Sequence, residues 1–206
     1  DTISQYMYSD MLSLAYRGEY DIVRCGFKRI YEFMAPCIEV TKRLNNIEEF
    51  RTSDEICKKF LPKFVGFLPG ESIEKRLPWS ACTYLYKSVI IKSKKIKFVS
   101  ERYSEDLFFN LEVLDAVETC ISTDEYYFYI DNPCSTMHQY NNPLVKCEKL
   151  LSFAEGKNKD IIKRTYLTIL NSLPEAATQL IYDTSIPWSE KKRILILLQQ
   201  NCFVPI

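Results

Sequence analysis

The acidic pair Glu105-Asp106 follows Ser104 directly, at the expected start of a long helix. A carboxylate held there, just after a loop, is well placed to act as a general base that takes a proton from a bound hydroxyl group. The alternative interpretation is structural. Acidic residues in a first helical turn are favoured by the helix dipole, by about 0.3–1 kcal/mol each. Residue spacing alone favours this structural interpretation.

Aromatic residues and lysines are further candidate binding groups. Trp79 and Tyr127, like Tyr126 and Tyr129, can stack on the faces of sugar rings, although core packing is the more common role of such residues. A run of lysines can attract phosphate or anionic lipid, although a solvated turn is the more common role of such a run. These lysines are Lys92, Lys94, Lys95 and Lys97.

The eight cysteines are spaced irregularly and include no Cys-x-x-Cys pair. In a small secreted domain that number would suggest a disulfide framework. A chain of 206 residues is long enough to fold on its hydrophobic core, and several of the cysteines have apolar neighbours. We therefore expect reduced thiols and a cytoplasmic location. Because His138 is the only histidine, a zinc site built from His and Cys is not expected.

Composition excludes several classes of protein. With 47% hydrophobic and 14% aromatic residues, the chain can form a core and is not expected to be disordered. Its 27 basic and 27 acidic residues give a formal net charge of +0, whereas a protein that binds nucleic acid by releasing counterions carries a basic excess. No apolar run approaches the ~20 residues needed to cross a bilayer, and the first residues lack the pattern of a signal peptide.

Hydrophobic periodicity predicts helices and strands in the first part of the chain. An amphipathic helix is expected over 3–16 and a strand over 20–31. A second extended piece at 37–44 could pair with that strand as a hairpin. Ser53 is expected to cap a helix that ends near Pro62.

The middle of the chain is predicted to be mainly helical, with short strands. Residues 79–92 are expected to be mostly helix, followed by a strand at 96–99. Ser104 is expected to cap a helix over 105–121, whose apolar residues recur at steps of three and four. The aromatic run 126–130 is expected to be a strand.

Beyond about residue 143 only helices are expected, with breaks at Gly156, Pro174 and Pro187. The predicted helices cover 144–155, 158–172, 174–183 and 189–200. The last is amphipathic, and we expect it to pack on its neighbours, with contact to a membrane surface as an open alternative. Composition and periodicity thus predict a few strands among helices, followed by a helical tail.

Four segments within residues 79–138 resemble, in order and spacing, the acceptor-side half of bacterial family 2 glycosyltransferases. In that family a Leu-Tyr-Lys/Arg helix is followed by an Ile-x-Phe strand, a Glu-Asp-Leu helix and a tyrosine-rich strand. The segments here are Leu85-Tyr86-Lys87, Ile96-Lys97-Phe98, Glu105-Asp106-Leu107-Phe108-Phe109 and Tyr126-Tyr127-Phe128-Tyr129. The beginning of the chain, from Asp1 to Phe27, is similar to the family's continuation after its Asp-x-Asp motif.

The resemblance implies an α/β fold. Residues 1–142 would be the C-terminal, acceptor-side part of a GT-A (Rossmann-like) fold, with a small mixed sheet and many helices. Residues 143–206 would be a helical extension. The activity implied is inverting transfer of a sugar from a nucleotide-sugar donor to a hydroxyl of a sugar or lipid-linked acceptor.

Site residues follow from the same resemblance. Asp106 would deprotonate the acceptor hydroxyl, and Glu105 would help to hold the acceptor or the loop. Trp79 and Tyr127 are the candidate acceptor-binding residues. A divalent cation, Mg²⁺ or Mn²⁺, would neutralise the leaving diphosphate. The candidate metal ligands are Asp1 and His138.

The sequence also departs from the family pattern. The donor-binding half and the Asp-x-Asp pair are absent, so we expect a fragment of a longer polypeptide, one that cannot be assumed active alone. Nucleic acid is not an expected partner. Homodimer formation and peripheral association with the inner face of a membrane remain open. The alternative hypothesis is a non-catalytic helical module that binds another protein.

Overall fold

The computed structural model describes residues 2–30, 47–72, 77–100, 104–130 and 143–202. The chain divides into two compact units. The first comprises Asp1–Leu61 and Pro78–Cys134, and the second comprises Pro62–Leu77 and Ser135–Ile206. The segment 62–77 therefore belongs with the C-terminal helices, which the sequence did not indicate. The domain boundary between residues 142 and 143 stays a prediction.

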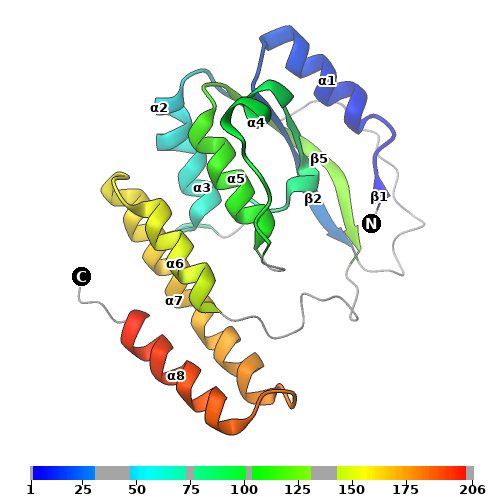
Figure 1. The fold of residues 1–206 in the computed structure, drawn as a ribbon. Coiled ribbons are helices and arrows are strands. Elements are labelled where there is room, and N and C mark those ends of the chain that lie inside the picture. Colours follow the sequence, from blue (N-terminus) through cyan, green and yellow to red (C-terminus); the bar gives the residue numbers. More distant parts are fainter. Residues whose placement is uncertain (1, 31–46, 73–76, 101–103, 131–142, 203–206) are drawn as a thin grey trace. The chain divides into compact units, whose positions relative to one another are not determined.

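The first unit is built on a small mixed sheet (Figure 1). Its strands are β1 (Thr2–Ile3), β2 (Ile22–Ile30), β3 (Glu48–Phe50), β4 (Tyr84–Tyr86) and β5 (Cys120–Ile130). The order is β1-β5-β2-β4, and β3 also pairs with β5. The central strands β2 and β5 are parallel, whereas β1, β3 and β4 each pair antiparallel with a neighbour. The predicted α/β class with a small mixed sheet is thus confirmed.

Helices cover the two faces of this sheet (Figure 1). On one face the apolar stripe of α1 (Met7–Gly18) joins alternate residues of β2 and β5. The buried cluster consists of Met7, Met11, Leu14, Tyr20, Val23, Cys25 and Ile121. Because side chains alternate along a strand, Tyr86 points to the other face. Its ring meets that of Phe109 in α5 (Glu105–Ala116) edge to face, at 5.3 Å between centroids.

The helical run after β3 differs from its prediction at both ends. It consists of α2 (Ser53–Glu55), a π-helical turn η2 (Ile56–Phe60) and α3 (Leu61–Val65). Thr52, not Ser53, is the N-cap, and its side chain accepts from the Glu55 amide. The run also continues past Pro62. The π-helical turn lies just before this proline, where the regular ladder loses an N–H donor.

The prediction of a mostly helical segment over 79–92 was wrong in its centre. A 3₁₀ turn η4 (Ala81–Thr83) leads into β4, and α4 (Ser88–Lys94) follows. Tyrosines suit a pleated surface, and β4 pairs with β2 through three consecutive residues. The strand expected at 96–99 is not present, since Ile96 to Val99 follow α4 without strand pairing.

The long middle helix is shorter than predicted. α5 ends at Ala116, and Val117 is already extended, with φ −105° and ψ 154°. Val117 and Ile121 continue the helical spacing, yet Ile121 belongs to β5, where it pairs with Val23. Ser104 is the N-cap residue but makes no side-chain capping bond, because its φ of 63° is left-handed. The strand predicted at 126–130 is confirmed and begins earlier, at Cys120.

The C-terminal helices of the second unit agree with the predicted ranges, with one exception. They are α6 (Pro143–Ala154), α7 (Lys159–Tyr182) and α8 (Trp188–Cys202). Pro174 lies inside α7 and does not break it. Leu180 of α7 and Ile194 of α8 form a buried cluster. In the described part of the chain, no helix combines the length and apolarity needed to span a bilayer. The extended piece predicted at 37–44 lies outside the described residues.

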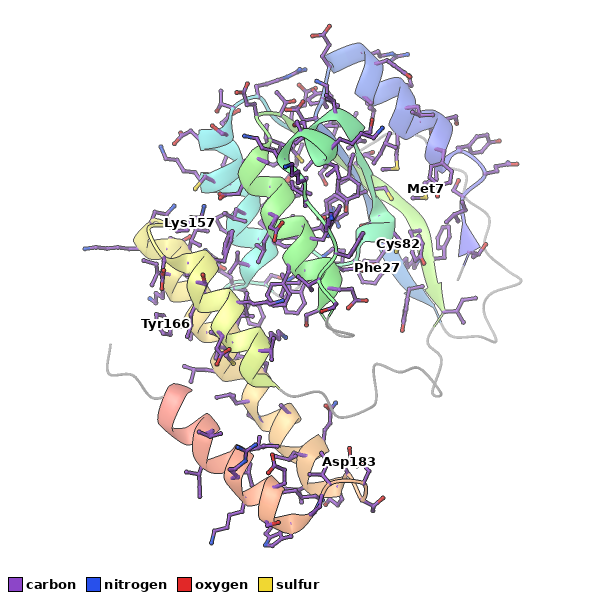
Figure 2. The ribbon with its side chains drawn as sticks, viewed as in Figure 1. Met7, Phe27, Cys82, Lys157, Tyr166 and Asp183 are labelled. Carbon is purple, nitrogen blue, oxygen red and sulfur yellow. The ribbon has the colours of Figure 1, made fainter. Side chains whose placement is uncertain are left out.

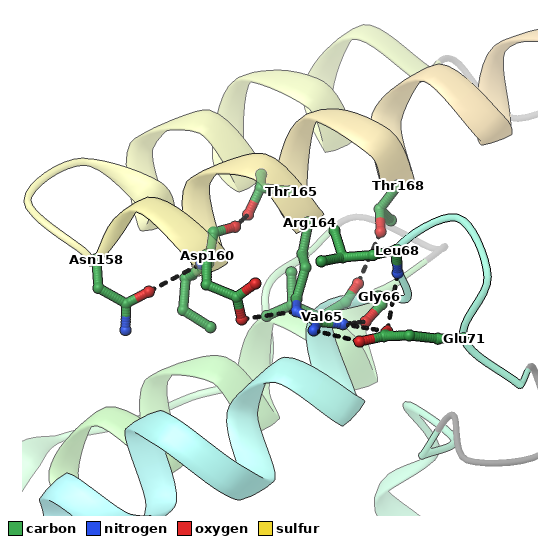
Figure 3. A network of polar contacts seen from close by, with 10 residues as sticks. Val65, Gly66, Leu68, Glu71, Asn158, Asp160, Arg164, Thr165 and Thr168 are labelled. Carbon is green, nitrogen blue, oxygen red and sulfur yellow. Dashed lines mark hydrogen bonds and ion pairs between the residues drawn. The ribbon is translucent and has the colours of Figure 1, made fainter.

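The segment 66–71 is fixed to α7 by one buried arginine (Figure 3). Arg164 forms two bonds to the Glu71 carboxylate, at 2.6 and 2.7 Å. It donates a third to the Gly66 carbonyl oxygen at 2.9 Å and a fourth to Asp160 at 2.8 Å. Thr168 donates to the Val65 carbonyl oxygen at 2.8 Å. These contacts explain why a segment from the middle of the sequence belongs to the C-terminal unit.

Candidate functional site

The first turn of α5 lies toward the carboxyl-terminal ends of the two parallel strands. α5 precedes β5 directly and packs on the sheet antiparallel to it, so the N-terminus of α5 faces the end of β5 (Figure 1). Ligands of open α/β sheets bind in the region outside the carboxyl ends of the strands. This position is therefore the first place to look for a functional group.

Asp106 is held by a backbone amide from the segment before β4. Its Oδ2 accepts a hydrogen bond from the Ala81 N–H at 3.0 Å. Its Oδ1 has no hydrogen-bond partner among the described residues. The side chain is partly exposed. One carboxylate oxygen is thus fixed in orientation while the other remains able to accept a proton.

Asn110, one helical turn after Asp106, binds the chain before and within β4 at two more points. Its Nδ2 donates to the Trp79 carbonyl oxygen at 2.8 Å, and its Oδ1 accepts from the Tyr86 hydroxyl at 2.7 Å. Asn110 is only 1% exposed. Burial raises the pKa of Tyr86, which keeps its hydroxyl a neutral donor. Sequence analysis missed Asn110, although a polar residue four positions after Asp106 in an apolar helix was the available signal.

Glu105 adjoins Asp106 in the sequence, and the bonds from Ala81 and Trp79 to α5 bring the backbone of Trp79 near it. Glu105 is partly exposed and makes no hydrogen bond or ion pair within the described residues. Trp79 is partly exposed and immediately precedes the segment that binds Asp106. The structure therefore brings together three of the residues singled out from the sequence: Glu105, Asp106 and Trp79.

Tyr127 lies on the opposite face of the sheet from α5. It packs against the buried cluster under α1 and contacts the thiol of Cys82. Burial and this contact raise the pKa of Tyr127. Cys82 follows Ala81, so η4 has Asp106 on one side and Tyr127 on the other. Cys82 itself is exposed, with its Sγ 2.8 Å from the Ser80 Oγ, and lies next to the strands near Phe27 (Figure 2).

A buried arginine on the α5 face was not anticipated. Arg24 of β2 pairs in register with Tyr84 and Ser122, and only 6% of it is exposed. Its Nη1 donates to the Ser122 Oγ at 2.9 Å, while Nε has no hydrogen-bond partner among the described residues. Burial raises the pKa of the Tyr84 hydroxyl, against the opposing effect of the Arg24 charge. A buried cation thus lies within the sheet, on the same face as α5.

The predicted metal ligands cannot be placed. Asp1 and His138 both lie outside the described residues. Within the described ranges, no group of three or more His, Cys, Asp or Glu side chains could hold a metal ion. The expected site for Mg²⁺ or Mn²⁺ therefore stays a prediction.

The buried Cys120 of the sheet is not a candidate for nucleophilic chemistry. Cys120 was expected on a helix but is the first residue of β5, where burial raises the pKa of its thiol to about 12. A thiol with that pKa is protonated near neutral pH and is therefore a poor nucleophile.

In comparisons with known proteins, no family model matches the chain, and no curated protein matches it either. The resemblance to glycosyltransferases is therefore carried by the quoted segments alone.

Proposed function

We propose that this chain is the acceptor-side part of an inverting, nucleotide-sugar-dependent glycosyltransferase of the GT-A type, similar to family 2, and that Asp106 is its general base. The observation that carries the proposal is the Asp106 carboxylate. One of its oxygens is bound by the Ala81 N–H at 3.0 Å, and α5, of which Asp106 is the second residue, begins toward the carboxyl ends of β2 and β5. This location is the usual one for ligand binding in open α/β folds.

The proposed reaction is a single displacement. The acceptor hydroxyl gives its proton to Oδ1 of Asp106 as its oxygen bonds to the anomeric carbon of the donor. The bond from that carbon to the nucleoside diphosphate breaks, and the electron pair leaves with the phosphate oxygen. Attack opposite to the leaving group inverts the configuration. The Ala81 N–H would hold the carboxylate in the orientation that this proton transfer needs.

The neighbouring residues would bind the acceptor. Glu105 would hold the acceptor or the preceding loop, and the ring of Trp79 would stack on a sugar face. Tyr127 remains a proposed acceptor-binding residue, reached from the other side of η4. A nucleotide-sugar is the proposed donor, and the site that binds it would belong to the complete enzyme. The irregular cysteines fit a reducing, cytoplasmic setting.

In the complete enzyme a divalent cation would neutralise the charge of the leaving diphosphate. Asp1 and His138 remain its proposed ligands. Because neither is among the described residues, the steps above involve only the base and the groups that orient it.

The experiment is the substitution Asp106→Asn in the complete enzyme. An asparagine can still accept the Ala81 N–H bond but cannot take the proton, so transfer should fall by about 10²–10⁴-fold. Donor binding, measured by calorimetry with the nucleotide-sugar, should stay nearly unchanged. Glu112→Gln is the matched control, because Glu112 is an exposed residue of the same helix and its substitution removes the same charge.

Retained turnover in Asp106→Asn would refute the role of base. Absence of turnover in the unsubstituted complete protein would instead favour the alternative, a non-catalytic module that binds another protein. The bonds from Ala81, Trp79 and Tyr86 to α5 would then be purely structural. The coding sequence upstream of Asp1 separates the two hypotheses further, since the enzyme requires a donor-binding strand and loop there.

A further inference from the structure

Four lysines around the end of α4 form an exposed cationic surface, which we call the lysine patch. Its members are Lys92, Lys94, Lys95 and Lys97. None of them has a hydrogen-bond or ion-pair partner among the described residues. The neighbouring Lys87, by contrast, is paired with Asp21 at 3.0 Å. Residues 87–100 contain no acidic residue, so this stretch of the chain carries a net positive charge.

Two large apolar side chains are exposed beside these lysines. Val89 is 59% exposed and Phe98 is 52% exposed. Apolar groups of this kind gain nothing from contact with a soluble anion such as phosphate. They do gain free energy by entering the acyl boundary of a bilayer, where amphipathic surfaces with basic residues bind.

The backbone holds the patch in a defined shape. α4 ends at Lys94, and the left-handed φ of 55° at the next residue, Lys95, turns the chain, while the Lys95 N–H bonds back to the helix. Ile96 is buried just after this turn. The ring of Phe98 stacks on Phe109 of α5, with 4.1 Å between centroids and 3° between planes. The lysines before and after the turn are therefore presented by an ordered surface.

We propose that the lysine patch, with Val89 and Phe98, docks this protein on an anionic lipid bilayer. The formal net charge of the whole chain is +0. Attraction to an anionic surface would therefore come from this local excess of positive charge and not from the charge of the whole chain. Each lysine near an anionic leaflet contributes about 1 kcal/mol, within roughly a Debye length of the surface. The mixture of unpaired lysines and exposed apolar side chains fits a lipid surface better than a soluble polyanion.

The α4 part of this surface lies away from the Asp106 site, whereas Phe98 stacks on Phe109, three residues after Asp106 in α5. The Lys87 N–H bonds to the Asp21 carbonyl oxygen just before β2 begins, so α4 starts at the amino end of β2. α5, whose second residue is Asp106, begins toward the carboxyl ends of β2 and β5 (Figure 1). Membrane binding can be tested without any enzyme assay.

The test measures co-sedimentation of the full chain with vesicles of phosphatidylcholine alone or of equimolar phosphatidylcholine and phosphatidylglycerol. We expect binding to the anionic vesicles only, weakened by salt. Removing all four lysines, by Lys→Gln at 92, 94, 95 and 97, should lower the partition constant by roughly several hundredfold, about fivefold per lysine. The matched control carries Lys→Gln at 58, 59, 163 and 192, four exposed lysines elsewhere. It should bind far more tightly than the patch variant.

A second variant separates a bilayer from a soluble polyanion. Val89→Ser should weaken binding to anionic vesicles by up to about tenfold, since complete burial of a valine side chain contributes about 1.5 kcal/mol. It should leave binding to heparin unchanged. Equal losses in the patch and control variants would overturn the proposal, because charge alone would then explain binding. Binding to heparin without binding to vesicles would also overturn it. Thermal unfolding by circular dichroism checks that all variants are folded.

Discussion

Asp21 joins three parts of the first unit through one small carboxylate. Its Oδ1 accepts from the Lys87 Nζ at 3.0 Å, and its Oδ2 accepts from the amides of Glu118 and Thr119 at 3.0 and 3.3 Å. Burial acts to raise the pKa of Asp21, but the hydrogen bonds from Glu118 and Lys87 outweigh it and hold that pKa below its ordinary value. The charged form of Asp21 therefore stabilises the start of β2 and the turn before β5.

Asp21→Asn should lower the free energy of unfolding at pH 7 by about 1.5–3 kcal/mol, the range for hydrogen bonds to charged groups. A depressed folded-state pKa contributes stability that is present above the ordinary pKa of about 3.9 and is lost as pH falls through the folded value. The difference between wild type and variant should thus shrink in acid. Urea unfolding at a series of pH values measures it.

The control for this prediction is Asp54→Asn, because Asp54 is exposed and makes only a surface ion pair with Lys58. Such pairs contribute little to stability. A loss as large in Asp54→Asn as in Asp21→Asn, or a pH-independent difference, would contradict the role given to Asp21.

At the scale of elements, α7 shows that tertiary packing can override a helix breaker. Proline in a helix interior removes one hydrogen bond and clashes with the preceding turn, yet α7 runs from Lys159 to Tyr182 through Pro174. Buried residues lie on both sides of the proline, Ile169 before it and Leu180 after it. The free energy gained by burying these two residues offsets the cost of the proline, and helix propensity alone does not include this gain.

Pro174→Ala should stabilise the second unit by about 2 kcal/mol. The gain is the ~3 kcal/mol cost of an interior proline, less the ~0.4–1 kcal/mol by which proline restricts the unfolded chain. Pro187→Ala is the comparison, because Pro187 stands before α8, where its ring costs no helical bond. That variant should be slightly destabilised. Thermal unfolding of both variants provides the measurement, and a lower midpoint for Pro174→Ala would contradict the argument.

At the scale of the whole molecule, each unit contains a glycine whose replacement requires repacking. A Cβ at Gly18 would overlap the buried ring of Tyr20 in the first unit. A Cβ at Gly66 would overlap the hydroxyl of Thr168 in the second. That hydroxyl is bonded to the Val65 carbonyl oxygen, so it cannot move away without losing a buried hydrogen bond.

Gly66→Ala and Gly18→Ala should therefore destabilise different parts of the chain. We expect each to cost about 1–3 kcal/mol, the usual range for overpacking. In hydrogen exchange measured by mass spectrometry, Gly66→Ala should speed exchange mainly in the second unit, and Gly18→Ala mainly in the first. Uniformly faster exchange over both units in either variant would contradict the division into two compact units.

Much of the local structure was predictable because it depends on local chemistry. The alternation of 20–31 indicated β2, and the aromatic run at 126–130 indicated the end of β5. The tail helices followed from periodicity and from the breaks at Gly156 and Pro187. Asp106 was identified from its place after a loop and at a helix start, and the structure puts it there.

Other features depended on partners that are distant in the sequence. Leu85 and Tyr86 belong to a strand because β2 pairs with them. Ile121 has the spacing expected of the helix before it, yet it belongs to a strand because Val23 pairs with it. Asn110 became important only when the fold brought Trp79 and Tyr86 to its amide.

The sequence by itself determined the presence of a few strands among helices, the tail of helices and the carboxylate at the start of α5, since all three follow from periodicity and residue type. Only the tertiary structure decided that 62–77 joins the C-terminal helices, through the buried Arg164. It also decided that Ala81 orients Asp106 and that Tyr127 lies across the sheet from α5. The physical reason is that hydrogen bonds and burial between distant residues leave no periodic pattern in the sequence.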